Sequence, residues 1–358
     1  MVRRMINFLT IDIEDYFQVH ALSGVIRYED WPNYECRVER NTHRLLEMLH
    51  DSIPNRQTAI PTHSLDNPLT QAVLPSSSSE ALLRPPTGPR ATFFILGWIA
   101  ERYPDLVRKI RKEGHEIACH GYAHKLIYEQ SKEEFRSDVR KAKVILEDIT
   151  GSEVIGYRAP GYSIVERSEW AFEILMEEGF RYDSSIFPIR HDFYGMPGAP
   201  RFPFLISRNG NGSVSFSGSV DLPFPPMNAS THSLVNSSDG PRSAIRDPQF
   251  LIEFPLSTVQ LLGMNLPVSG GGYFRLFPYS LVKRGLQRLN EVEKRPFIFY
   301  VHPWELDDGQ PKIQGLGLRS RFRHYVNLSR TEEKLAKLLG DFDFCTIRDL
   351  LPTVRQQA

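Results

Sequence analysis

The segment Phe8-Leu-Thr-Ile-Asp-Ile-Glu-Asp15 is a short apolar run that ends in acids. Such a run predicts a buried β-strand, and in α/β barrels the catalytic groups stand at the carboxyl ends of the strands. Asp15 could simply belong to a solvated turn, but Asp12 lies inside the apolar pattern, where an acid is costly unless it has a role. The segment therefore predicts a barrel strand that leads into a functional site.

The remaining chain alternates short β-rich runs with runs of helical periodicity, which favours a parallel α/β architecture. The predicted strands are Phe8–Ile13, Ala91–Leu96, Glu116–His120, Val154–Arg158, Leu251–Pro255 and Phe297–His302. The predicted helices are Pro104–Glu113, Ser131–Ile149, Ser168–Glu178, Tyr279–Val292 and Thr331–Leu339. One domain over residues 1–358 is expected, with two interruptions: a mobile insertion at 51–90, rich in Pro, Ser and Thr, and a long loop at 207–247.

Composition excludes several classes of partner. The chain has 43 Lys+Arg and 43 Asp+Glu, so no overall charge attracts nucleic acid or an anionic membrane. The three scattered cysteines indicate a reducing compartment. We find no signal-peptide pattern and no apolar stretch long enough to span a bilayer. A cytoplasmic protein is expected, with peripheral attachment to the inner membrane left open.

The motif His120-Gly-Tyr-Ala-His124 follows a predicted strand, so its two histidines can converge on one metal ion. Two unrelated surface histidines would give the same pattern, and a nearby carboxylate is needed to decide between these interpretations. In an extended strand Asp12 and Glu14 share a face while Asp15 points the other way. A bend after Ile13 would reverse that assignment.

Two further strand ends carry polar groups. Arg158 precedes the turn Pro160-Gly161-Tyr162, where a guanidinium can hold a carboxylate and backbone N–H groups can point inward. His302 ends an almost wholly apolar strand, and its intrinsic pKa near 6.5 suits a proton donor. A solvated arginine or a packed histidine would explain either one alone. Such groups at successive strand ends favour a shared site.

Taken in order, these motifs resemble the polysaccharide deacetylases with NodB homology, carbohydrate esterase family four. The resemblance implies a distorted (β/α) barrel with fewer than eight strands and a divalent metal, most simply zinc. It implies that Asp12 is the general base aimed by Arg158, that His302 is the general acid, and that His120 and His124 bind the metal. Pro160, Gly161, Tyr162, Asp183 and Trp304 are the substrate contacts that it implies.

One departure concerns the third metal ligand. The family's first motif has adjacent aspartates, whereas Ile13 follows Asp12 here, so Glu14 or Asp15 is expected to supply the ligand, with Glu14 preferred. A closer resemblance, to a subgroup encoded near bacterial exosortase and exopolysaccharide loci, rests on Gly270-Gly-Gly-Tyr-Phe-Arg275 and His302-Pro-Trp-Glu305, within a family-specific part at 250–352.

The sequence thus predicts a hydrolase of carbon–nitrogen bonds that removes N-acetyl groups from an amino-sugar polysaccharide in bacterial exopolysaccharide biosynthesis. The expected partner is an N-acetylated oligo- or polysaccharide, with no nucleic acid. Two alternatives stay open: an amidase acting on a small cyclic or linear amide, and a non-catalytic carbohydrate-binding barrel.

Overall fold

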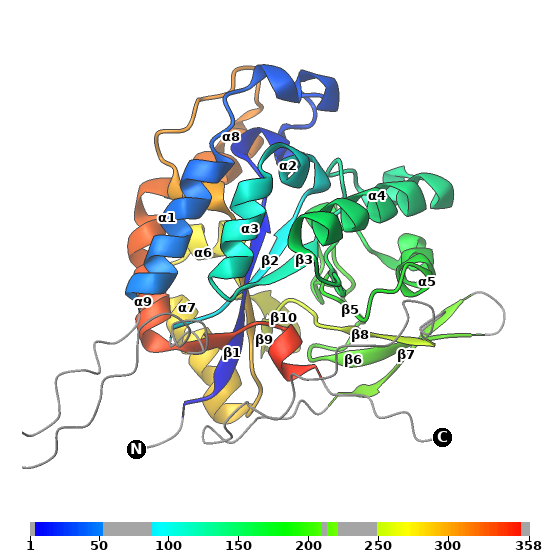
Figure 1. Cartoon of the computed structure of the whole chain (residues 1–358). Coiled ribbons are helices and arrows are strands. Elements are labelled where there is room, and N and C mark those ends of the chain that lie inside the picture. Colours follow the sequence, from blue (N-terminus) through cyan, green and yellow to red (C-terminus); the bar gives the residue numbers. More distant parts are fainter. Residues whose placement is uncertain (1–3, 53–87, 210–212, 221–248, 352–358) are drawn as a thin grey trace, which may run out of the picture.

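The computed structural model describes residues 4–52, 88–209, 213–220 and 249–351, and Figure 1 shows how their elements are arranged. Most of the predicted insertion at 51–90 lies outside the described residues, as does much of the predicted loop at 207–247. Within the described ranges, no helix is both long and apolar enough to cross a bilayer.

A run of parallel strands forms the centre of the molecule (Figure 1). In spatial order they are β11 (Ile298–Val301), β1 (Ile6–Ile13), β2 (Thr92–Ile95), β3 (Glu116–Cys119), β4 (Gly156–Tyr157), β5 (Tyr182–Asp183) and β8 (Phe250–Glu253). A short strand, β12 (Asp343–Cys345), also pairs with β1 in parallel. Because all these strands point the same way, their carboxyl ends meet at one end of the sheet.

The far edge of the sheet is antiparallel. β6 (Phe204–Arg208) pairs with β8, and β7 (Val214–Ser219) pairs with β6. At the opposite edge, Ile298 of β11 donates to the Ser257 hydroxyl over 2.8 Å, and Tyr300 donates to the Ser269 carbonyl over 2.7 Å. The prediction of an α/β fold built on a parallel sheet is confirmed and is consistent with a distorted barrel, although no closed ring is present among the described pairings.

Helices cover the outside of the sheet (Figure 1). They are α1 (Val38–Asp51), α2 (Gly97–Arg102), α3 (Pro104–Lys112), α4 (Lys132–Thr150), α5 (Trp170–Glu177), α6 (Gly271–Leu276), α7 (Tyr279–Gln287), α8 (Leu318–Tyr325) and α9 (Thr331–Asp341). A capping box begins α4: the Glu134 amide donates to the Ser131 hydroxyl, and the Ser131 amide donates to the Glu134 carboxylate. The apolar face of α3, with Leu106, Val107 and Ile110, is buried.

The structure differs from the sequence prediction in several elements. Part of the predicted loop at 207–247 forms β7, which pairs with β6 in an antiparallel ribbon. The predicted helix Tyr279–Val292 divides into α7 and a π-helical turn, Arg288–Val292. A two-stranded hairpin of β9 (Thr258–Leu261) and β10 (Met264–Pro267), absent from the prediction, precedes α6.

Candidate active site

The predicted site residues come together where the central strands end. Ile11 of β1 is in register with Val301 of β11, so Asp12 and His302 are the next residues on adjacent strands. On the other side of β1, β2 separates it from β3, whose last residue, Cys119, precedes His120. Parallel register therefore places residues about 290 positions apart in sequence at one end of the sheet.

Glu14, His120 and His124 form a buried cluster that could hold a metal ion. One ligand atom of each lies within 4.8 Å of the other two. The Glu14 Oε2 atom is buried and has no hydrogen-bond partner among the described residues, although it lies 2.7 Å from His124 Nε2. Two imidazoles and one carboxylate are the donor set of many catalytic zinc sites. The residues present therefore fit a divalent cation.

The pKa values of this cluster follow from its charges. Burial alone would raise the pKa of Glu14, but His124 and His302 lower it to about 2. Burial and the nearby His124 lower the pKa of His120 to about 4, against the opposing effect of Asp12. An ionised carboxylate beside a neutral imidazole is the protonation state in which both side chains bind metal.

Backbone contacts orient His120. Its Nδ1 atom lies 2.8 Å from the Arg158 carbonyl oxygen. Because a carbonyl oxygen only accepts, Nδ1 carries the hydrogen and the lone pair is on Nε2. A histidine ligand held through its other ring nitrogen is the usual arrangement at metal sites.

The loop from His120 to His124 is held by Asp138 of α4. The Asp138 carboxylate accepts from the amides of Tyr122, at 2.7 Å, and Ala123, at 3.2 Å. His124 has a left-handed backbone with φ +52°. Such a conformation costs free energy for a residue with a side chain, so the surrounding contacts must fix it. The sequence pattern gave no indication of the role of Asp138.

Asp15, the alternative third ligand, lies outside the cluster. Its fully buried carboxylate accepts from the backbone amides of Tyr16, Arg37 and Val38. These contacts begin a 3-10 turn and hold the start of α1 against the end of β1. The structure therefore brings Glu14, and not Asp15, to the two histidines. The chain does bend after Ile13, since the Glu14 amide donates to the Asp12 carbonyl, yet Asp12 and Glu14 still face the same site.

Arg158 holds Asp12 from inside the barrel. Its Nη1 atom donates to Asp12 Oδ1 over 2.7 Å and to the Thr10 hydroxyl over 2.8 Å. The contact to Asp12 uses one nitrogen only, because Nε and Nη2 donate to the carbonyl and hydroxyl oxygens of Ser184. Asp12 Oδ2 is therefore left to face the site, where the Tyr162 hydroxyl lies 3.4 Å away.

The turn after Arg158 is tight. Gly161 and Tyr162 both have left-handed backbones, with φ of +59° and +54°. The Tyr162 amide donates to the Ala159 carbonyl within the turn, and Pro160 has no N–H group. The Tyr162 ring is almost fully buried, so its hydroxyl, rather than its ring face, is what points toward Asp12.

His302 faces both carboxylates. Its Nε2 atom lies 3.3 Å from Glu14 Oε1 and 3.8 Å from Asp12 Oδ2, and its Nδ1 atom lies 3.6 Å from Glu305 Oε1. Burial alone would lower the pKa of His302, but the charges of Glu14, Glu305 and Asp12 raise it to about 9. The side chain is 15% exposed, so a solute can reach it.

Glu305 and Arg275 form an outer layer behind His302. Arg275 Nε donates to Glu305 Oε1 over 3.1 Å, and both side chains are almost fully buried. A buried ion pair persists only with such direct partners. Both residues stand in the motifs that carry the subgroup resemblance, but their sequence pattern gave them no role.

Trp304 and Asp183 were predicted to contact substrate, and the structure places both inside the protein. The Trp304 ring stacks on His324 with centroids 4.6 Å apart, and its Nε1 atom donates to Glu14 Oε1 over 3.2 Å. Asp183 accepts from the Ser185 amide and hydroxyl, and that hydroxyl in turn accepts from the Ala159 amide. In this arrangement Trp304 orients Glu14 and Asp183 supports the Arg158 turn, because neither side chain faces solvent.

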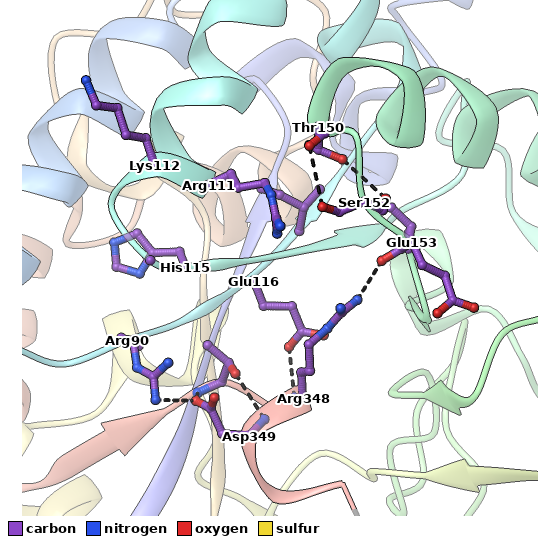
Figure 2. A pocket seen from close by; sticks show the side chains of 14 residues that line it. Arg90, Arg111, Lys112, His115, Glu116, Thr150, Ser152, Glu153, Arg348 and Asp349 are labelled. Carbon is purple, nitrogen blue, oxygen red and sulfur yellow. Dashed lines mark hydrogen bonds and ion pairs between the residues drawn. The ribbon is translucent and has the colours of Figure 1, made fainter. Parts of the chain in front are cut away.

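Figure 2 shows a separate pocket of about 490 Å³ at the opposite end of the sheet, near the amino ends of β2 and β3. Among its lining residues are Arg90, Arg111, His115 and Glu116. It contains none of the predicted site residues. The carboxylate of Glu116 already accepts from the Thr92 and Tyr182 hydroxyls and the Arg348 amide. The candidate site is therefore the cluster at the carboxyl end of the strands.

Comparison with known families gives two matches. Residues 86–176 match the family model described as polysaccharide deacetylase, a range that includes His120, His124 and Arg158. Residues 224–352, a range that includes His302 and Glu305, match a domain of unknown function, DUF3473. The second range overlaps the C-terminal part on which the subgroup resemblance rests.

Curated relatives are deacetylases. A peptidoglycan-N-acetylglucosamine deacetylase from Bacillus cereus is 36% identical over 85 residues, which are 24% of this chain and 31% of that protein. A peptidoglycan deacetylase from Helicobacter pylori is 31% identical over 103 residues, 29% of this chain and 33% of that protein. The chain thus spans about a third of the length of these relatives.

A solved structure from Mycobacterium smegmatis, provisionally described as a polysaccharide deacetylase, aligns over 100% of this chain and 99% of its own, with 14% identity and a TM-score of 0.48. The similarity to deacetylases rests on the family model and the curated relatives. Over residues 86–176, the chain is similar to the polysaccharide deacetylase family.

Proposed function

We propose that the protein removes N-acetyl groups from an amino-sugar polymer by metal-dependent hydrolysis. The observation that carries this proposal is the shared space between Asp12 Oδ2, His302 Nε2 and the Glu14–His120–His124 cluster. Hydrolysis of an acetamide needs a general base, a general acid and a Lewis acid close to one carbonyl carbon. The deacetylase relatives support the choice of an acetamide as the group attacked.

Glu14, His120 and His124 would hold the metal ion. When bound, a divalent ion such as zinc polarises a carbonyl group and lowers the pKa of a bound water molecule toward neutral pH. Trp304 would orient Glu14 through its N–H group, and the Arg158 carbonyl would orient His120.

In the proposed reaction, Asp12 accepts a proton from the attacking water. The water oxygen forms a bond to the acetyl carbon, and the carbon–nitrogen bond then breaks as His302 donates a proton to the leaving amine. The products are acetate and a free amino sugar. Arg158 acts as a positioning residue, because it fixes one oxygen of Asp12 and leaves the other to face the site.

Negative charge develops on the acetyl oxygen during this reaction. The Tyr162 amide already donates within its own turn, so we propose the Gly161 amide as the backbone donor toward that oxygen. The left-handed conformation of Gly161 allows the backbone to approach a ligand there.

We propose an N-acetylated exopolysaccharide as the substrate, because the chain resembles the exopolysaccharide-locus subgroup. An amidase for a small amide would use the same acid and base, and a carbohydrate-binding barrel would need neither. Acetate release from N-acetylglucosamine oligomers, partially acetylated exopolysaccharide and a small cyclic amide separates these functions. Release from the cyclic amide alone, or from none of them by the zinc-loaded protein, would contradict the proposal.

A further inference from the structure

The hairpin of β9 and β10 exposes a cluster of large apolar side chains. Leu262 at its tip is 89% exposed, and Leu261, Met264 and Leu266 are 55%, 60% and 39% exposed. Single apolar residues on a surface are ordinary, whereas four on one small element mark a contact surface. We call these four residues the hairpin tip cluster.

The turn itself uses an unfavourable residue. Leu262 and Gly263 connect the two strands and have φ of +50° and +78°, the left-handed pair of a two-residue hairpin turn. Asn or Gly suits the first of these positions, and leucine costs free energy there. The chain thus keeps an exposed leucine in a conformation that disfavours it, which indicates a role outside folding.

The strand register makes the hairpin amphipathic. Val259 pairs with Leu266 and Leu261 pairs with Met264, so these four side chains share one face, while Gln260 and Asn265 lie on the other. Val259 packs beside α7: a Cβ atom on Gly285 would lie 3.5 Å from it. The apolar face is therefore anchored at its base and has no partner among the described residues at its tip.

The neighbouring helix extends this surface. Leu281, which is exposed, precedes Gly285 by four residues, so it lies on the side of α7 next to the hairpin. Arg284 and Arg288 follow Leu281 by three and seven residues, on or beside the same side. Arg284 forms no ion pair with any residue that the structure describes.

Positive charge gathers around the base of the hairpin. The Arg201 guanidinium donates to the hydroxyl and carbonyl oxygens of Thr258 at the start of β9. Glu293 forms ion pairs with both Arg201 and Arg288, and Glu291 is a further acid on the turn after α7. These three arginines and two acids leave a net charge of +1 at this surface, with Arg201 and Arg288 sharing the Glu293 carboxylate.

We infer that the hairpin tip cluster inserts into the interface of a membrane rich in anionic lipids. A narrow ribbon of four apolar side chains is convex and cannot supply the roughly 20–30 residues a side of a stable protein interface. Insertion of apolar side chains, with cations beside the headgroups, is how peripheral proteins bind such membranes. This inference is independent of the proposed deacetylation.

Vesicle sedimentation of the full chain tests the inference. Wild type should sediment with phosphatidylglycerol-containing vesicles, less with phosphatidylcholine vesicles, and less when salt rises from about 50 mM to about 500 mM. Leu262→Asn should weaken binding about tenfold or more, because the inserted side chain is lost. Asparagine suits the left-handed position, so its melting temperature should not fall.

Leu318→Asn is the matched control, since Leu318 is 86% exposed on α8, away from the hairpin. It should bind vesicles within about twofold of wild type, because it removes the same apolar surface elsewhere. Arg284→Glu should weaken binding to the anionic vesicles at low salt. Wild type that stays in solution with anionic vesicles, or Leu262→Asn that binds as wild type does, would overturn the inference. The inference would also be overturned if wild type formed a dimer but did not bind vesicles, and Leu262→Asn dissociated that dimer.

Discussion

Arg158 Nη1 lies 2.7 Å from Asp12 Oδ1, and the carbonyl of the same arginine accepts from His120 Nδ1. One residue thus positions both the proposed base and a proposed metal ligand. Its guanidinium has no exposed surface and donates to Thr10 and Ser184 as well as to Asp12. The proposed base and the proposed metal ligand are therefore parts of one hydrogen-bonded unit.

The first prediction separates the side-chain role of Arg158 from its backbone role. Arg158→Lys keeps the carbonyl that orients His120 but cannot reproduce the fork of donors to Asp12, Thr10 and Ser184. Turnover should fall about tenfold or more while zinc content stays near that of wild type. Acetate release and elemental analysis on the same sample measure both. Loss of zinc together with activity would show that the guanidinium maintains the whole site and not Asp12 alone.

The second prediction concerns the two acids after Ile13. Glu14→Gln should lower zinc affinity well over tenfold, because it removes a charged ligand from the cluster. Asp15→Asn should retain zinc and lose stability by about 1–3 kcal/mol, because an amide cannot accept all the N–H donors that now surround the Asp15 carboxylate. Zinc titration and chemical denaturation distinguish the two variants. The opposite pattern would make Asp15 the ligand.

The third prediction concerns pH. The pKa of His302 is raised to about 9 by the neighbouring carboxylates, so its acid form persists at neutral pH and is lost as pH rises through that value. A bound cation offsets the charge of Glu14, so the alkaline limb of kcat should lie between about 6.5, the unperturbed value, and about 9. His302→Ala should lose this limb and about 10²-fold or more in turnover.

The fourth prediction tests Glu305 as a positioning residue. Its charge helps to raise the pKa of His302, so Glu305→Gln should move the alkaline limb to lower pH while zinc content is unchanged. A structural role alone would lower activity without moving the limb. Because the change also leaves Arg275 without its buried acid, the melting temperature must be measured beside the pH profile.

The fifth prediction concerns Trp304. Trp304→Phe keeps an aromatic ring to stack on His324 but removes the N–H donor to Glu14. Zinc affinity should fall by roughly 10-fold or more, as for other residues that orient a metal ligand. Substrate affinity should change little, because the ring is buried and stacks against His302. A large rise in KM with unchanged zinc binding would instead favour direct stacking of Trp304 on a sugar.

The sequence allowed prediction of the elements whose pattern is local. Apolar runs such as Phe297–His302 and the Ser131–Glu134 capping box are visible in single segments, and both correspond to elements of the structure. The alternation of side chains along an extended strand also predicted that Asp12 and Glu14 share one face of the strand. The two-residue strands β4 and β5 depend on pairing with neighbours, and β7 lies in a segment whose composition is typical of a loop.

The residues that sequence reasoning missed act at long range. Glu305 acquires its role from Arg275, and Asp138 from the amides of a loop that precedes it by about 15 residues. Trp304 shows the converse case, because an aromatic residue beside a site has the same sequence signature whether it faces sugar or packs beneath a histidine. Only the packed structure distinguishes these possibilities.

Acetate release by zinc-loaded wild type and Asp12→Asn, at matched zinc content, tests the central claim most directly. With an N-acetylated oligosaccharide as substrate, wild type should release acetate and leave a free amine, and the variant should be slower by about 10²-fold or more. Equal rates for the two proteins, or no acetate from any N-acetylated glycan by wild type that holds zinc, would contradict the account.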